Sequence, residues 1–400
     1  MSFKQYITFC ITILVTIVQT ISAEDNDTIT HKKIIHKLGF DIASGYIFPT
    51  HRFLKGVNYK EKPMHTCVSA NLKYGFQFGE DTYFGRNYPH TTQGIGVSYN
   101  TFFNKKELGN PIAIYAFQGS RIASLSDKLS LDYEWNLGAS FGWKKYDERT
   151  NPNNKLIGSK INAYLNFGLL FNWHLSSDWN LKAGVAYTHC SNGDTHYPNY
   201  GSNVLSPRIG VVRTFGANQN NKHHRFIKKD IFKPYICYDL IIFGATRQKE
   251  IYSEQKEEKV TIPGSFGVIG LNFNPLYNIN RYFRAGVSLD ILYNESANLK
   301  DHIASDQVTE DVKFHRPPFI EQFSAGLSLR AEFVMPIFSI NAGIGRNFIC
   351  KGEETNCFYQ LFAMKVHVSR SMFLHIGYQL YNFKEPNNLM LGIGYRFNSK

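Results

Sequence analysis

The sequence has no long hydrophobic run beyond its N-terminal stretch. After that stretch, no segment offers the roughly 18 consecutive apolar residues that a membrane-spanning helix needs, so helical spans are excluded. The N-terminal stretch combines a charge at Lys4, an apolar run from Tyr6 to Gln19 and the small residue Ala23 before Glu24. This pattern predicts a secretory signal peptide over residues 1–23. A membrane anchor is the alternative interpretation of the same stretch.

Cysteine is scarce and follows no metal-binding or disulfide spacing. Cys10 falls within the signal peptide, and the other five are Cys67, Cys190, Cys237, Cys350 and Cys357. They include no CxxC pair and make no disulfide framework. Cys350 and Cys357 flank a short stretch, so a hairpin disulfide between them is left open. The sequence also lacks a glycine-rich phosphate loop and any set of metal-spaced ligands.

Aromatic residues and glycine are abundant. Aromatics make up 15% of the chain, which contains 31 glycines. A secreted chain with this composition and no long apolar run is typical of a membrane β-barrel, although a soluble secreted β-protein shares these features. The formal net charge is +12. In an outer-membrane protein, basic loops would face the phosphates of lipopolysaccharide.

Apolar and polar residues alternate with a period of two along many segments, as in strands with two different faces. Between residues 161 and 175 one face is wholly apolar and the other is polar or small. The apolar face consists of Ile161, Ala163, Leu165, Phe167, Leu169, Phe171, Trp173 and Leu175. The same alternation covers residues 131–143, 323–333 and 389–397.

Charges on the polar faces decide between a soluble sandwich and a membrane barrel. Asp132, Glu134, Arg330 and Glu332 lie on such faces, and unpaired charges in a sandwich core would be too costly. We therefore predict an all-β fold, an antiparallel transmembrane outer-membrane β-barrel with apolar residues facing lipid. The four charges are interpreted as interior networks rather than as the carboxylate pair of a glycosidase.

About sixteen strands are predicted, and tight turns such as residues 176–178 alternate with long loops such as residues 294–318, which is the habit of membrane barrels. A polar linker over residues 217–230 interrupts this pattern. It separates an eight-strand unit, residues 24–216, from a second block of about eight strands, residues 231–400. The two halves form two small barrels, which we favour, or one large barrel.

One stretch, residues 188–203, carries groups suited to acyl transfer. His189 and Ser191 continue the lipid-facing row of one strand, and residues two apart on a strand share a face. Asn203 belongs to the lipid-facing row of the next strand, provided that the regular alternation of that strand extends back to residue 203. A nucleophile beside a base beside an orienting group is the arrangement of serine acyl transfer. A site on the lipid-facing wall implies a membrane-resident substrate, an acylated lipid.

The residues around this trio have their own interpretations. Asn192 and the backbone of Gly193 are placed to donate hydrogen bonds to a developing oxyanion. Cys190 points to the barrel interior by parity, where a small buried thiol is expected. Asp194 and His196 are interpreted as loop residues. A histidine and a serine at a strand end are also ordinary interface residues, which is the alternative to catalysis.

The stretch resembles the signature of PagL-type lipid A 3-O-deacylases, a family also described as acyloxyacyl hydrolases. The residues that match at the family's spacing are His189, Ser191, Asn192, Pro198, Asn199 and Gly201. The resemblance spans one eight-strand unit, roughly residues 38–216. It implies that His189 is the general base, that Ser191 is the nucleophile, and that Asn192 with Gly193 forms the oxyanion region.

The sequence departs from the family pattern at Asn203, where the family has an acid. An amide can take this place when its carbonyl accepts the imidazole N–H, as in Cys-His-Asn sites. An uncharged side chain is also less costly than a carboxylate at a lipid-facing rim. We therefore predict that Asn203 orients the histidine in an active enzyme.

The resemblance implies an outer-membrane esterase that hydrolyses an ester-linked acyl chain of lipid A, at the 3-O position, by a Ser-His mechanism without cofactor or metal. The expected partners are lipid A, or lipopolysaccharide, of the outer leaflet and the membrane itself, and no nucleic acid. One alternative is an esterase for secondary acyloxyacyl chains or phospholipid. The other is a non-enzymatic structural barrel, adhesin or pore in which the motif is a relic. Residues 231–400 receive no role.

Overall fold

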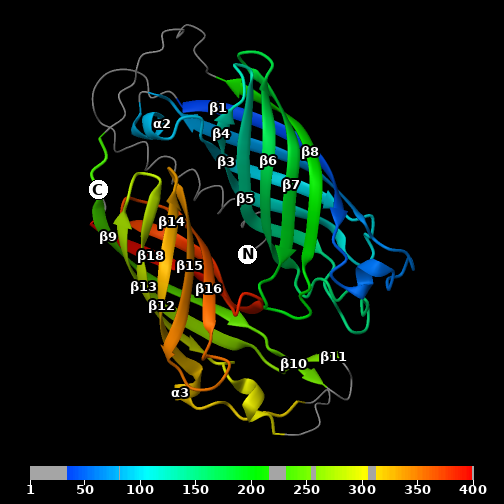
Figure 1. Ribbon diagram of the computed structural model, residues 1–400. Coiled ribbons are helices and arrows are strands. Elements are labelled where there is room, and N and C mark those ends of the chain that lie inside the picture. Colours follow the sequence, from blue (N-terminus) through cyan, green and yellow to red (C-terminus); the bar gives the residue numbers. More distant parts are fainter. Residues whose placement is uncertain (1–33, 81, 216–230, 254–257, 305–311, 399–400) are drawn as a thin grey trace. The chain divides into compact units, whose positions relative to one another are not determined.

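The computed structural model describes residues 34–80, 82–215, 231–253, 258–304 and 312–398. The predicted signal peptide, residues 1–23, and the predicted linker, residues 217–230, lie outside these ranges. No helix within the described ranges is long and apolar enough to cross a membrane. The chain divides into two compact units, each with its own sheet (Figure 1).

The first unit is a closed antiparallel barrel in which every strand pairs with its neighbour in sequence. Its strands are β1 (Ile34–Ile47), β2 (Thr66–Phe78), β3 (Thr92–Thr101), β4 (Gly109–Ser124), β5 (Leu129–Trp143), β6 (Ile161–His174), β7 (Trp179–Ser191) and β8 (Ser202–Phe215). The barrel closes because β8 pairs with β1, for example through Ile209 and Ile42. Two short helical turns, η1 (Arg52–Lys55) and α2 (Tyr83–Asn87), lie in its connections.

The second unit is another closed barrel, in which β18 returns to pair with β9. Its strands are β9 (Tyr235–Arg247), β12 (Phe266–Asn278), β13 (Phe283–Asn294), β14 (Phe323–Val334), β15 (Phe338–Ile349), β16 (Phe358–His367), β17 (Met372–Tyr381) and β18 (Glu385–Phe397). A separate hairpin, β10 (Glu250–Ser253) with β11 (Glu258–Thr261), and the turns η2 (Leu299–His302) and α3 (Phe319–Gln322) lie in its connections. The predicted all-β barrel fold is confirmed, and the alternative with two eight-strand barrels is the correct one.

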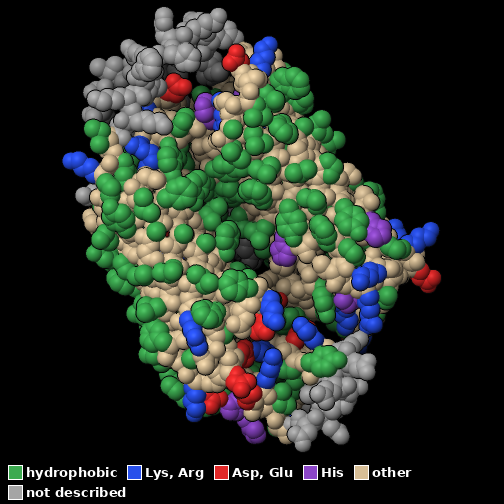
Figure 2. Space-filling view, in the orientation of Figure 1, with side chains coloured by type: hydrophobic (Ala, Val, Ile, Leu, Met, Phe, Trp, Pro, Cys, Tyr) green, Lys and Arg blue, Asp and Glu red, His purple; other side chains and the backbone are tan. Residues whose placement is uncertain are grey.

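Alternation along each strand produces an apolar outer wall. On β6, Phe167 and Trp173 are 50% and 53% exposed, whereas Asn166 and Asn172 are buried. Because residues two apart share a face of a strand, this division follows from the period-two sequence. Figure 2 shows hydrophobic side chains covering much of the strand surface in view. An apolar wall around a polar interior is the requirement for a barrel in lipid.

Charged residues inside the first barrel are paired with one another. Nζ of Lys73 lies 2.6 Å from carboxylate oxygens of both Asp41 and Glu134, and Nη2 of Arg208 lies 2.9 Å from Glu134. All four side chains are buried, and pairing is what makes buried charge tolerable. The comparable network in the second barrel consists of Asp239, Arg284, Glu332, Lys365 and Arg396. The interior charges therefore form networks, as predicted.

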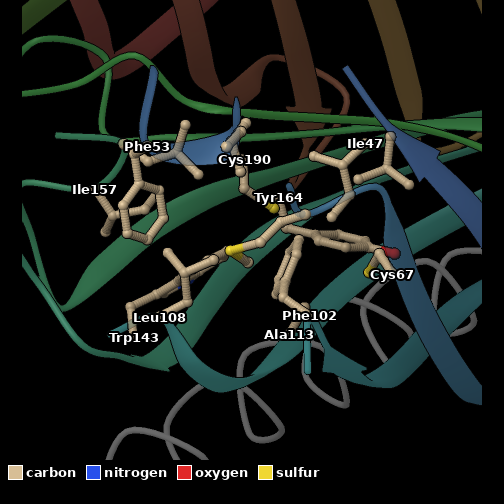
Figure 3. Packing of buried hydrophobic residues seen from close by; sticks show 14 of the residues in the cluster. Ile47, Phe53, Cys67, Phe102, Leu108, Ala113, Trp143, Ile157, Tyr164 and Cys190 are labelled. Atoms are coloured by element: carbon tan, nitrogen blue, oxygen red, sulfur yellow. The ribbon is translucent and has the colours of Figure 1, made fainter. Parts of the chain in front are cut away.

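A cluster of buried apolar side chains fills the long-loop end of the first barrel (Figure 3). It includes Phe53 and Leu54 from η1 and Leu156 and Ile157 from the connection between β5 and β6. Cys190, near the end of β7, points into this cluster, as its parity predicts, and is 5% exposed. The cluster supports from inside the same strand ends that carry the predicted site. Since the described cysteines are all free, no hairpin disulfide is formed.

Candidate active site

The predicted site lies where β7 ends and β8 begins. His189 and Ser191 are among the last residues of β7, and Asn203 is the second residue of β8. The antiparallel register pairs His189 directly with Asn203. All three side chains are partly buried and share the outer face of β7 and β8 with Val185, which is 50% exposed. Strand pairing thus brings the predicted trio together at the rim of the outer wall.

Hydrogen bonds connect the three side chains. Nε2 of His189 lies 2.9 Å from Oγ of Ser191, and Nδ1 lies 2.7 Å from Oδ1 of Asn203. The amide oxygen of Asn203 can only accept, so Nδ1 carries the imidazole proton. Nε2 is then unprotonated and accepts the hydroxyl proton of Ser191. This is the geometry in which a histidine serves a serine as general base.

Tyr187, which the predicted trio does not include, belongs to the same cluster. Its hydroxyl donates to Oδ1 of Asn203 at 2.8 Å. The sequence does show that Tyr187 lies on the same face of the strand as His189, because the two residues are two positions apart. The contact itself depends on the register of β8 against β7, which pairs Tyr187 with Leu205.

The residues predicted to hold an oxyanion lie in the connection after β7. Asn192 is buried; its backbone N–H donates to Oδ1 of Asn199 at 3.0 Å, and its side-chain Nδ2 donates to the carbonyl of His196 at 2.7 Å. Asn192 therefore uses its backbone N–H and one N–H of its side-chain amide to organise the loop, and the amide has a second N–H. Gly193 has a φ of 63°, and its N–H makes no hydrogen bond to another described residue. This N–H is the backbone donor still available for a ligand.

Asn199, which the sequence shows only as a match to the family's spacing, organises this loop through two hydrogen bonds. Besides accepting from Asn192, it donates from Nδ2 to Oδ1 of Asp194 at 3.0 Å. Asp194 is 3% exposed, so its carboxylate is held inside the loop rather than beside His189. The side chain of Asn199 thus ties both ends of the turn together. Only a known loop conformation could have shown this function.

Gly201 lies where a side chain would disturb the histidine. Its φ is 68°, a conformation that favours glycine. A Cβ atom there would lie 3.2 Å from Cε1 of His189 and 3.1 Å from the carbonyl oxygen of Cys190. The N–H of Gly201 also donates to the carbonyl of Leu156 at 3.0 Å, which ties this turn to the apolar cluster. The glycine therefore lets the turn pass close behind the imidazole.

The acidic, histidine and cysteine side chains are the candidates for metal ligation. Across the ranges that the structure describes, no three of these residues are grouped so that they could hold a metal ion.

A barrel with an apolar outer wall and a serine–histidine pair at its rim defines an outer-membrane protein with the groups of an acyl hydrolase. Residues 73–212 match the family model described as lipid A 3-O-deacylase (PagL), and residues 236–399 match the model described as acyloxyacyl hydrolase, C-terminal domain. Together the two matches span more than half of the 400 residues. The chain belongs to the PagL family of outer-membrane lipid A deacylases.

The match over residues 236–399 covers a part of the chain to which the sequence resemblance did not extend. That resemblance was limited to roughly residues 38–216, because it depended on the short motif at the end of β7. The C-terminal family model begins at residue 236, next to the start of β9, and covers the whole second barrel. The second barrel is therefore also part of the family.

Solved structures similar to the chain are outer-membrane proteins of low sequence identity, and no curated protein matches it. Neisserial surface protein A (NspA) is 9% identical, with a TM-score of 0.29, and the match covers 46% of this chain and 97% of that one. The outer membrane protein Omp33 of Acinetobacter baumannii is 8% identical, with a TM-score of 0.15 and coverage of 91% and 98%. The siderophore receptor PirA of the same organism is 8% identical, with a TM-score of 0.22, and this chain covers 57% of it. Similarities this weak say nothing about the site.

Proposed function

We propose that this protein hydrolyses an ester-linked acyl chain of lipid A, at the 3-O position, with Ser191 as nucleophile and His189 as general base. The observation that carries the proposal is the 2.9 Å separation between Nε2 of His189 and Oγ of Ser191 on the outer wall of the barrel. Because the amide oxygen of Asn203 accepts the hydrogen bond from Nδ1 of His189, Nε2 is unprotonated and can take the hydroxyl proton of Ser191. Membership of the PagL family supplies lipid A as the substrate.

The reaction has two halves. In the first, Oγ of Ser191 attacks the ester carbonyl while Nε2 of His189 takes the hydroxyl proton. The tetrahedral intermediate then collapses, the sugar oxygen leaves with that proton, and the acyl chain stays on Ser191. In the second half, water attacks the acyl-enzyme and gives a proton to Nε2, which returns it to Oγ as the fatty acid departs. One water is consumed for each ester bond broken.

Neighbouring groups stabilise the charges that develop. Oδ1 of Asn203, 2.7 Å from Nδ1, holds the imidazole in the required tautomer and favours the imidazolium. We assign the oxyanion to the N–H of Gly193, together with the second N–H of the Asn192 amide. Cys190 has no part in the reaction, because its side chain is buried in the apolar cluster on the other face of β7.

The substrate reaches this site from the membrane. Leu165, which pairs with His189, and Leu205, which pairs with Tyr187, are 42% and 45% exposed on the outer wall. An acyl chain in the outer leaflet can lie along these side chains while its ester group, near the head group, meets Ser191 at the rim. The lipid therefore reacts without leaving the bilayer.

We propose residues 24–216 as the deacylase unit, because every residue of the site comes from β7, β8 and the connection between them. The remaining proposed segments are the signal peptide, residues 1–23, the linker, residues 217–230, and the second barrel unit, residues 231–400. The second barrel supplies none of the groups used in the mechanism.

The test is the full chain, purified in detergent and incubated with hexa-acylated lipid A and, separately, with phospholipid vesicles. We expect mass spectra of the products to show release of a 3-hydroxy fatty acid. Release of an unsubstituted fatty acid would instead identify an esterase for secondary acyloxyacyl chains, and lysophospholipid would identify a phospholipase. If neither lipid changes, the motif is a relic and the protein is a structural barrel, adhesin or pore.

A further inference from the structure

We infer that Tyr187 is a positioning residue, whose hydroxyl keeps the carbonyl oxygen of Asn203 turned toward His189. The inference rests on the proposed function and explains how an amide can stand where the family has an acid. The supporting contacts are the two hydrogen bonds to Oδ1 of Asn203, at 2.8 Å from the Tyr187 hydroxyl and 2.7 Å from Nδ1 of His189.

An asparagine in this place has a weakness that an aspartate lacks. Its amide can rotate by half a turn about the last side-chain torsion, which exchanges the oxygen for the NH2 group. In the exchanged orientation Nδ2 would donate to Nδ1 of His189, and the imidazole proton would then be on Nε2. Nε2 would face Ser191 as a donor, so it could no longer remove the hydroxyl proton. The orientation of one amide therefore decides whether the base is active.

Tyr187 makes the exchanged orientation unfavourable. The ring is 42% exposed on the outer wall, and the bond to Asn203 is the hydroxyl's hydrogen bond within the described structure. If the amide turned, the hydroxyl could accept from Nδ2, but its own proton would lose the acceptor that it has within the described structure. Losing this hydrogen bond raises the free energy of the exchanged orientation. The hydroxyl therefore selects the orientation in which Oδ1 faces both donors.

Strand geometry places the hydroxyl where it is needed. Tyr187 and His189 lie two residues apart on β7 and share a face, and Asn203 is directly opposite His189 on β8. The contact from Tyr187 to Asn203 is the diagonal one across the strand pair, which a tyrosine is long enough to span. The orienting group thus comes from the same rigid strand as the base, not from the loop.

A carboxylate at position 203 would not need this help, because its two oxygens are equivalent acceptors. The inference therefore predicts a dependence on context. Tyr187→Phe should lower kcat for lipid A deacylation by about tenfold in the natural chain, the scale of a lost orienting hydrogen bond. In the Asn203→Asp background, the same substitution should change kcat by less than about threefold.

Tyr99→Phe is the matched control. Tyr99 is also a half-exposed tyrosine on the outer wall, and its hydroxyl is bonded to the side chain of Asn110 at 2.8 Å. It lies on β3, away from the site. Its substitution should leave kcat unchanged, which separates loss of orientation from general loss of a rim hydroxyl. Equal losses in Tyr187→Phe and Tyr99→Phe would overturn the inference.

The tautomer of His189 gives a readout that does not require activity. In the full chain in micelles, 15N spectra of labelled imidazole should show the proton on Nδ1 in the natural protein. Tyr187→Phe should move part of the population to Nε2–H, and adding Asn203→Asp should restore Nδ1–H. If the protein proves inactive but the tautomers shift in this way, the positioning role stands and the proposed function fails. If Tyr187→Phe leaves both tautomer and kcat unchanged, the positioning role is wrong.

Discussion

Nδ1 of His189 lies 2.7 Å from Oδ1 of Asn203, its direct partner across β7 and β8. For catalysis, Nε2 of the His189 ring must accept a proton from Ser191. The oxygen of Asn203 on the other side of the ring can only accept a hydrogen bond, so Nδ1 must be the donor. The contact therefore selects the tautomer of the neutral ring that carries its proton on Nδ1 before any substrate arrives. The position at which the sequence resemblance leads one to expect an acid is thus filled by a group of suitable geometry.

Replacing Asn203 tests that contact. Asn203→Ala removes the acceptor, leaves the tautomer of His189 unselected, and should lower the rate of lipid A deacylation by about tenfold or more. Asn203→Glu introduces the acid that the resemblance leads one to expect at this position and should preserve or raise the rate. Rates measured on purified proteins in one detergent check both. An undiminished rate in Asn203→Ala would mean that another group orients the histidine.

Gly201 offers a test of the space behind the imidazole. Gly201→Ala adds a Cβ atom 3.2 Å from Cε1 of His189 in a backbone conformation with φ of 68°, so it should displace the ring. Since small misplacements of catalytic groups are costly, we expect kcat to fall by about tenfold to a hundredfold. Gly264→Ala is the matched control, because φ there is also positive but no atom lies within 4 Å of the added Cβ. Equal effects of the two substitutions would show that backbone strain alone is responsible.

The direction in which β7 faces can be measured with single cysteines. Val185 is 50% exposed on the outer wall and Ala186, its neighbour, is 3% exposed in the interior. Val185→Cys should react with a bilayer-restricted reagent, and Ala186→Cys should not. Gly184 is unsuitable as the inward position, because a Cβ there would lie 2.1 Å from the carbonyl oxygen of Leu169. The reverse labelling pattern would place the site in the lumen, one residue out of register.

The interior network of the second barrel should contribute strongly to its stability. Oε1 of Glu332 lies 2.9 Å from Arg284 and 3.1 Å from Arg396, and its other oxygen contacts Lys365. Glu332→Gln leaves these buried cations short of one negative partner and should lower the free energy of unfolding by about 3–5 kcal/mol. Urea unfolding in micelles would measure it.

An exposed ion pair of the same barrel serves as the comparison. Arg316 is paired with Glu295 at 3.1 Å, but its side chain is 66% exposed. Arg316→Gln should change the free energy of unfolding by less than about 1 kcal/mol, because solvent screens such pairs. If Glu332→Gln were equally mild, the interior network would be well hydrated rather than buried.

Much of the fold could be predicted because strand side chains repeat every two residues. The alternation from Ile161 to Leu175 is enough to say which side chains face outward. Charged residues on the opposite faces, such as Glu134 and Glu332, are enough to show that these faces line the interior of a barrel. Alternation says nothing about which strands pair across long connections. The number of barrels therefore depended on the pairing of β18 with β9 and of β8 with β1, which only the structure shows.

The site was predictable to the same extent. Parity on a single strand brings His189 and Ser191 together, and no further information is needed for that pair. Contacts between strands depend on register, and so the hydroxyl of Tyr187 on Asn203 could not be foreseen. Contacts within the connection depend on its particular turn, and so the bonds from Asn199 to Asn192 and Asp194 were also missed.

We propose Ser191, and not its neighbour Cys190, as the nucleophile. The direct measurement is mass spectrometry of lipid A from cells of one strain that express equal amounts of the natural protein, Ser191→Ala or Cys190→Ala. We expect lipid A lacking one 3-hydroxyacyl chain with the natural protein and with Cys190→Ala, and unmodified lipid A with Ser191→Ala. Deacylated lipid A from the Ser191→Ala cells would show that Ser191 is not the nucleophile.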